Sequence, residues 1–131
     1  LFGTLLSSTG MIPIDRDGGA ATIRLLMREG ERAAAEDRQI VIFPEGTRGE
    51  PDHMLPLQPG IAALAARTKL PVVPVLTDSG RCWGRRAFHK HPGIIRIAIR
   101  PPLPQGLRRD ELVDRLSAEL SRSPDAVQAC G

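Results

Sequence analysis

Aromatic residues and cysteines are scarce in this sequence of 131 residues. It has three Phe, one Trp and no Tyr, so the core must be built mainly from Leu, Ile, Val and Ala. The two cysteines, Cys82 and Cys130, stand far apart and match neither a disulfide framework nor the spacing of zinc ligands. Two isolated thiols of this kind suit a reducing compartment.

Long apolar runs are also missing. No stretch approaches the ~20 apolar residues that a membrane-spanning helix needs, and the first residues do not resemble a signal peptide. Any membrane contact is therefore expected to be peripheral, or to come from residues upstream. Because the sequence starts at Leu1 within what reads as mid-domain sequence, we expect an N-terminally incomplete domain.

The charge is unevenly distributed although the net charge is only +3. Between Ser79 and Arg109 the sequence has eight basic residues and no acidic one, whereas the rest has ten basic and fifteen acidic residues. A segregated basic region favours anionic partners such as phospholipid head groups, acidic carrier proteins or nucleic acid. It contains no helix-turn-helix, zinc-finger or aromatic RNA-binding signature, so we expect no nucleic-acid partner.

Apolar periodicity predicts alternating strands and helices. Strands are expected at 11–14, 39–43, 72–76 and 94–99, and helices at 20–37, 59–67 and 110–120. Gly30 interrupts the first helical pattern and weakens it. This order predicts an α/β fold in which helices flank a mostly parallel sheet. We expect one domain over 1–120 and a loose tail over 121–131.

The segment Phe43–Arg48, with the sequence FPEGTR, carries the strongest chemical signal. It follows a predicted buried strand, and ligands of open α/β sheets bind at the C-terminal ends of strands. Gly46 permits a tight turn, and the planar guanidinium of Arg48 matches phosphate oxygens in bidentate geometry. By itself this pattern also fits an ordinary loop with a Glu–Arg ion pair.

Two further segments favour a ligand-binding site over an ordinary loop. Gly10–Arg16 ends a predicted strand with an arginine, and Leu70–Val75 is a strand that contains a proline. Together with Phe43–Arg48 these segments resemble, in the right order, three conserved blocks of the glycerolipid acyltransferase family. That family includes the 1-acyl-glycerol-3-phosphate acyltransferases. The resemblance extends from Leu1 to about Leu120, as the C-terminal two-thirds of such a domain.

The resemblance implies a reaction and its binding residues. A fatty acyl group would pass from a thioester, on acyl-carrier protein or acyl-CoA, to the free hydroxyl of a lysophospholipid, without a cofactor or metal. The matching positions imply that the glycerol-phosphate part is bound by Arg16, Glu45, Gly46, Thr47 and Arg48. Pro74 falls in the block that the family associates with the acyl pocket, although a purely structural role for it is an equal alternative.

The catalytic block of that family, a His followed by four residues and an Asp, is absent. Five positions after His53, His89 and His91 stand Gln58, Ile94 and Arg96, so none of these histidines fits. That His acts as general base on the acceptor hydroxyl, a contribution of roughly 10²–10⁴-fold. We therefore expect the motif upstream of this chain and no catalysis by the 131 residues alone.

A basic segment with interspersed aromatic residues is a candidate membrane or carrier contact. It includes Trp83, Arg85, Arg86, Phe88 and Lys90. Aromatic rings at head-group depth and cations on lipid phosphates are typical of a bilayer interface, which here would be the cytoplasmic face of the inner membrane. The alternative is an ordinary solvated basic loop.

Two other functions remain open at this level. One is acyl transfer to a different acceptor, such as a lyso-ornithine lipid or dihydroxyacetone phosphate. The other is a basic anion-binding module that is not an enzyme.

Overall fold

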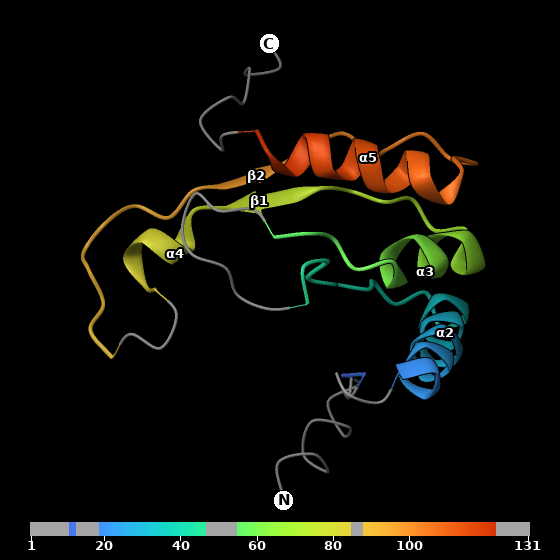
Figure 1. Cartoon of the computed structure of the whole chain (residues 1–131). Coiled ribbons are helices and arrows are strands. Elements are labelled where there is room, and N and C mark those ends of the chain that lie inside the picture. Colours follow the sequence, from blue (N-terminus) through green and yellow to red (C-terminus); the bar gives the residue numbers. More distant parts are fainter. Residues whose placement is uncertain (1–10, 13–18, 47–54, 85–87, 123–131) are drawn as a thin grey trace, which may run out of the picture.

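The computed structural model describes residues 11–12, 19–46, 55–84 and 88–122, and Figure 1 shows their arrangement. In chain order the elements are α2 (Gly19–Ala35), α3 (Gly60–Thr68), β1 (Val75–Thr77), α4 (Ser79–Cys82), β2 (Ile97–Ile99) and α5 (Arg109–Leu120). Helix α2 packs on α3, α3 packs on α5, and the strands β1 and β2 pair with each other. The described fold is thus a mixture of helices and a small sheet.

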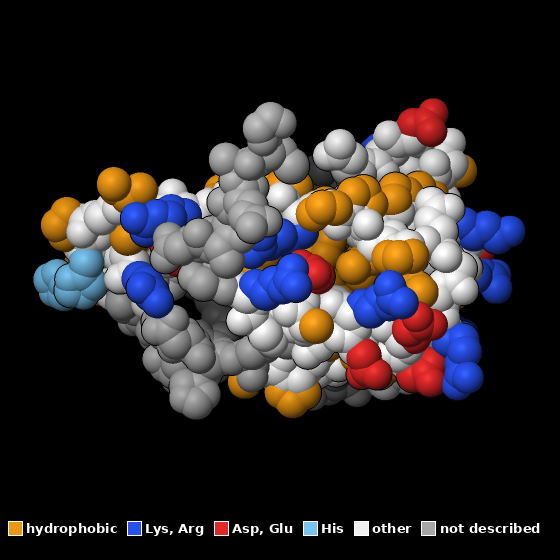
Figure 2. Space-filling view, turned by 90° about the horizontal axis from the view of Figure 1, so that it is seen from above, with side chains coloured by type: hydrophobic (Ala, Val, Ile, Leu, Met, Phe, Trp, Pro, Cys, Tyr) orange, Lys and Arg blue, Asp and Glu red, His pale blue; other side chains and the backbone are white. Residues whose placement is uncertain are grey.

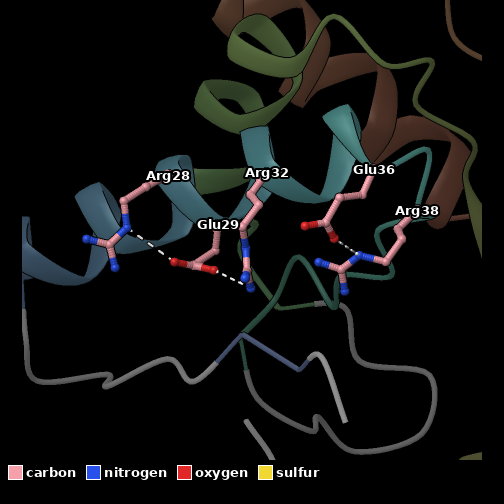
Figure 3. A network of polar contacts seen from close by, with 5 residues as sticks. All are labelled: Arg28, Glu29, Arg32, Glu36 and Arg38. Atoms are coloured by element: carbon pink, nitrogen blue, oxygen red, sulfur yellow. Dashed lines mark hydrogen bonds and ion pairs between the residues drawn. The ribbon is translucent and has the colours of Figure 1, made fainter. Parts of the chain in front are cut away.

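Helix α2 is the first predicted helix and continues through Gly30, despite the low helix propensity of glycine. Ion pairs line its exposed side: Glu29 contacts Arg28 at 3.2 Å and Arg32 at 2.8 Å, and Glu36 contacts Arg38 just beyond the helix (Figure 3). Exposed pairs of this kind contribute at most about 1 kcal/mol each. Packing against α3 must therefore supply most of the stability of α2.

Gly30 is buried and allows α2 and α3 to approach closely. A Cβ atom at this position would collide with Cδ1 of Leu64, a buried side chain of α3. The low helix propensity of glycine is therefore offset by helix packing, which single-helix reasoning does not include.

Helix α3 matches its prediction within a residue at each end. Pro59 precedes it with φ −64°, the value to which its ring restricts the backbone. Lys69 ends it in a left-handed conformation, with φ 55° and its N–H donating to the carbonyl of Ala65. The helix directs Ile61, Ala62 and Leu64 into the interior.

The sheet departs from the expected topology. Strands β1 and β2 are antiparallel, with Val75 opposite Ile99 and Thr77 opposite Ile97, so the parallel pairing predicted for a layered sheet is not what the described residues form. Backbone hydrogen bonds extend the pairing beyond the strands, from Asp78 to Arg96, from Arg100 to Pro74 and from Leu103 to Val72. Both strands are shorter than predicted, and β1 begins only after Pro74, which lacks an N–H to donate.

The prediction of a strand at 39–43 is wrong, because these residues form no strand in the structure. Ile42 packs against the core, whereas Val41 and Phe43 are 83% and 79% exposed. The alternation of buried and exposed side chains is that of a strand, but the backbone lacks a sheet partner among the described residues. Of the strand predicted at 11–14, only Met11 and Ile12 are described.

Helix α5 begins one residue before the helix predicted at 110–120, and it closes the core. Leu112 and Leu116 are its buried residues, and Leu116 packs with Ile61 of α3 and with Leu103, which follows β2. Figure 1 shows α5 running alongside the strands, with α3 below them. Of the tail predicted at 121–131, only Ser121 and Arg122 are described.

The Gly30–Leu64 contact predicts a specific pattern of stability. Gly30→Ala gains about 1 kcal/mol of helix propensity but overpacks the helix interface at a cost of about 1–3 kcal/mol, so we expect a net loss of stability. In a Leu64→Ala background the obstructing atom is gone, and the same substitution should stabilise. Urea unfolding of the two single variants and the double variant measures this; equal effects of Gly30→Ala in both backgrounds would contradict it.

Candidate functional site

The candidate site centres on a tight turn over the first four residues of the FPEGTR segment. The N–H of Gly46 donates to the carbonyl of Phe43 at 3.0 Å. Pro44 occupies the second position of this four-residue turn and Gly46 the fourth, as is typical of a type I turn. Gly46 also has φ +69°, a left-handed conformation that favours glycine. The predicted role of Gly46 in a tight turn is thus confirmed by the backbone.

A second segment of the chain braces this turn. The N–H of Gln58 donates to the carbonyl of Pro44 at 2.7 Å. The side chain of Gln58 lies so close that a Cβ at Gly46 would be 3.3 Å from its Cγ. Gln58 immediately precedes Pro59 and α3, so the turn is attached to the start of a helix that is anchored in the core. Sequence reasoning did not assign Gln58 any role at the site.

The turn holds only part of the predicted phosphate-binding set. Glu45 is half-buried within the turn and Gly46 is exposed beside it. Arg16, Thr47 and Arg48 lie outside the described residues. The convergence of two arginine side chains on one phosphate therefore stays a prediction.

Pro74 is fully buried. It precedes β1, and its carbonyl accepts the N–H of Arg100 at 2.9 Å. These contacts give Pro74 a structural role in joining the segments that contain β1 and β2. Its association with an acyl pocket stays a prediction.

Helix α4 with Trp83, and the chain from Phe88 to Arg96, form a lobe that projects from the end of the β1–β2 pair (Figure 1). Trp83, Phe88 and Lys90 are all exposed, and the ammonium group of Lys90 lies 4.5 Å from the centroid of the Trp83 ring. Hydrophobic, His and Lys/Arg side chains gather at this end of the molecule (Figure 2). Arg85 and Arg86 lie outside the described residues.

The base of this lobe is closed by a contact that the sequence did not predict. Asp78 Oδ1 accepts the backbone N–H of Arg96 at 2.7 Å, and Oδ2 lies 3.5 Å from the Arg96 guanidinium. The hydrogen bond from the Arg96 N–H, together with the guanidinium charge, lowers the pKa of Asp78 from its ordinary value of 3.8, although partial burial opposes this shift. Eighteen residues separate the two partners, which makes the pair invisible to local pattern analysis.

Neither a metal site nor a membrane-spanning helix is found in the part of the chain that the structure describes. Within the described residues, no three His, Cys, Asp or Glu side chains gather as a metal site would require. None of the described helices is both long enough and apolar enough to cross a bilayer.

Comparison with known proteins identifies the class of the domain. The family model described as "Acyltransferase" matches residues 1–78, a range that includes the turn at Phe43–Gly46 and strand β1. The chain therefore belongs to the acyltransferase family, and the resemblance inferred from the three sequence blocks is confirmed.

Several relatives have a more specific name, 1-acyl-sn-glycerol-3-phosphate acyltransferase. The Pseudomonas aeruginosa protein is 32% identical over 102 residues, which are 78% of this chain and 40% of that protein. The Limnanthes douglasii protein is 35% identical over 105 residues, 79% of this chain and 37% of its own length. The human protein of that name, the alpha form, is 32% identical over 114 residues, 82% of this chain and 40% of its own. The chain thus spans about two fifths of these relatives, and no solved structure matches it significantly.

The turn geometry predicts that Gly46→Ala destabilises the protein by more than about 1–2 kcal/mol, the cost of a left-handed conformation for a residue with a Cβ. Crowding against Gln58 adds to this cost. Gly106→Ala is the matched control, because Gly106 has φ +76° but a Cβ there would meet nothing within 4 Å. Chemical denaturation of both variants compares the two positions, and equal losses would show that Gln58 does not constrain the turn.

The Asp78–Arg96 contact predicts a stability term that depends on pH. Because the pKa of Asp78 is lowered in the folded state, its ionised form stabilises the fold above pH 3.8, and this contribution is lost as the pH falls through the folded-state pKa. Asp78→Asn should therefore be less stable than the parent at pH 7, with a difference that shrinks at acid pH. Urea unfolding at both pH values tests this; a constant difference would contradict it.

Proposed function

We propose that this chain is the phosphate-binding part of a 1-acyl-sn-glycerol-3-phosphate acyltransferase. The reaction would transfer a fatty acyl group from a thioester donor to the free hydroxyl of 1-acyl-glycerol-3-phosphate, giving phosphatidic acid for phospholipid synthesis. The observation that carries this proposal is the FPEGTR segment, whose described part forms a braced turn within the region matched by the family model. The names of the relatives point to the same acceptor.

Phosphate binding follows from the chemistry of the residues around this turn. Arg48 is two residues beyond Gly46 in the sequence, and its guanidinium would bind the phosphate in bidentate geometry. Arg16 would supply a second guanidinium from the end of another segment. Each charge-assisted hydrogen bond contributes about 1.5–3 kcal/mol, so two arginines can hold an anionic head group strongly enough to position its hydroxyl. Glu45 would orient Arg48 or accept a hydrogen bond from the acceptor.

The general base of the reaction is proposed to lie outside these 131 residues. A base must take the proton of the acceptor hydroxyl as its oxygen attacks the thioester carbonyl, and the carrier thiol leaves. None of the three histidines stands five residues before an aspartate. The proposal is therefore that a His and an Asp from upstream sequence complete the site.

We also propose that the longer domain contains the layered, mostly parallel sheet expected from the sequence. Val41 and Phe43 are large apolar side chains that are exposed in an extended segment. Pairing of residues 39–43 as a strand in a longer domain would satisfy their backbone groups and cover these side chains. The FPEGTR turn would then stand at the C-terminal end of that strand, where α/β folds bind ligands.

The proposal also includes the acyl donor and the cellular location of the reaction. Acyl-carrier protein and acyl-CoA are both anionic carriers of a thioester, and the basic region between Ser79 and Arg109 suits either. Because a lysophospholipid acceptor resides in a bilayer, the reaction is placed at the cytoplasmic face of the inner membrane. The alternative acceptors are a lyso-ornithine lipid and dihydroxyacetone phosphate. A binding assay that compares the affinities for these acceptors distinguishes them.

The proposal predicts that the chain binds 1-acyl-glycerol-3-phosphate much more tightly than 1-acyl-glycerol, which lacks the phosphate. Arg48→Ala should weaken this binding about ten- to a hundredfold, from the loss of one charged interaction. Arg48→Lys should lose less, because it keeps the charge but not the bidentate fork. Calorimetric titration measures these affinities, with Arg115→Ala on α5 as the control variant.

Acyl transfer provides a second readout. The 131-residue chain should show no turnover with acyl-CoA or acyl-carrier protein, since it lacks the His–Asp motif. Equal affinity for the two lipids would reject phosphate recognition, and turnover by this chain alone would reject the upstream base.

A further inference from the structure

Four large apolar side chains stand exposed on the projecting lobe. Trp83 is 55% exposed, Phe88 95%, Ile94 76% and Ile95 51%. Isolated exposed apolar residues are common on soluble proteins, but several of them in one lobe indicate an interaction surface. We refer to these four residues together with Lys90 as the apolar lobe.

Contacts across the lobe hold these residues in place. The Asp78–Arg96 contact closes its base. Nearer the tip, the N–H of His91 donates to the carbonyl of Cys82 at 2.8 Å. Gly93 lies so close to Cys82 that a Cβ there would be 2.9 Å from Sγ. These contacts join residues 78–82 to residues 91–96. The apolar side chains are therefore exposed on a part of the structure that is braced from both sides.

The charge of the lobe has one sign. No acidic residue occurs between Asp78 and Asp110 in the sequence. The ammonium group of Lys90 lies over the ring of Trp83 at 4.5 Å, so a cation and an aromatic face are presented together. Figure 2 shows Lys/Arg, His and hydrophobic side chains mixed at this end of the molecule.

The apolar surface continues along the sheet. Ile97 and Ile99 are 66% and 69% exposed on the face of β2 opposite to the buried Ala98. Val75, the partner of Ile99 in the register, is 51% exposed. Since directly paired residues share one face of a sheet, these three side chains form a single exposed apolar face that follows the lobe in the chain.

We propose that the apolar lobe is the docking site for an anionic lipid bilayer, with Trp83, Phe88, Ile94 and Ile95 at the depth of the head groups and Lys90 against lipid phosphates. Aromatic rings and lysine side chains favour this interface because each has an apolar body and a polar end. This binding goes beyond the proposed reaction, since it needs neither turnover nor the phosphate-binding turn.

The same surface fits an acidic carrier protein less well. A carrier is recognised mainly through paired charges, and such contacts would not cover side chains as exposed as Phe88 and Ile94. A bilayer covers them without requiring a complementary shape. Binding of acyl-carrier protein is thus the competing outcome of the test.

The experiment measures binding of the chain to vesicles of phosphatidylcholine with and without phosphatidylglycerol, in the absence of lysophospholipid. Trp83 is the single tryptophan of the sequence, so its fluorescence reports on the lobe directly. We expect tighter binding to the anionic vesicles, a blue shift of the Trp83 emission and quenching by brominated acyl chains. Added salt should weaken the binding because it screens the charges.

Two lobe variants have matched controls on α2. Lys90→Glu should weaken anionic vesicle binding about tenfold or more, since each basic residue near the surface contributes a several-fold factor; Arg28→Glu, also an exposed position, should change it less than twofold. Phe88→Ser combined with Ile94→Ser should abolish the blue shift, whereas Ile23→Ser should not. Circular dichroism confirms that each variant remains folded.

Three results would overturn the proposal. The first is absence of vesicle binding by the parent chain, and the second is equal loss in the lobe variants and the α2 variants. The third is unchanged vesicle binding with weakened binding of acyl-carrier protein, which would assign the lobe to the carrier. A failure of phosphate recognition in the Arg48 variants leaves the vesicle result intact, so the two proposals can fail separately.

Discussion

The antiparallel contact between residues 72–78 and 96–103 is the constraint on which the rest of the described structure depends. Its backbone hydrogen bonds extend from Leu103 and Val72, next to the core, to Asp78 and Arg96, at the base of the lobe. At one end Leu103 packs with Ile61 and Leu116, which links the sheet to α3 and α5. At the other end the same contact closes the projecting lobe. One ladder of hydrogen bonds thus connects the hydrophobic core to the proposed membrane surface.

The turn at Phe43–Gly46, which we propose to bind phosphate, is attached to this core by a different route. Gln58 braces the turn through Pro44 and stands two residues before α3, whose residue Ile61 belongs to the core. A rigid attachment matters because an arginine that must meet a phosphate gains affinity when its position is fixed before the ligand arrives. The turn and the lobe are therefore attached to one core but supported by separate contacts, which allows the functions proposed for them to be tested independently.

Much of the local structure could be predicted from the sequence. Helices α3 and α5 were predicted closely because their apolar spacing, and Pro59 before α3, are local signals. The turn at Gly46 was predicted because glycine tolerates the backbone conformations that tight turns require. The parallel sheet and the strand at 39–43 were not obtained, since strand pairing depends on partners distant in the chain. The joint position of Arg16 and Arg48 stays a prediction.

The sequence by itself determined the family of this protein, because the FPEGTR segment and the two blocks around it are patterns of residue type and spacing. It also determined the segregation of positive charge after Ser79 and the absence of the His–Asp motif. Only the tertiary structure decided that Gly30 serves helix packing, that Gln58 braces the turn and that Asp78 meets Arg96 to close the lobe. The physical reason is that these contacts join residues far apart in the sequence, whose proximity depends on how the whole chain folds.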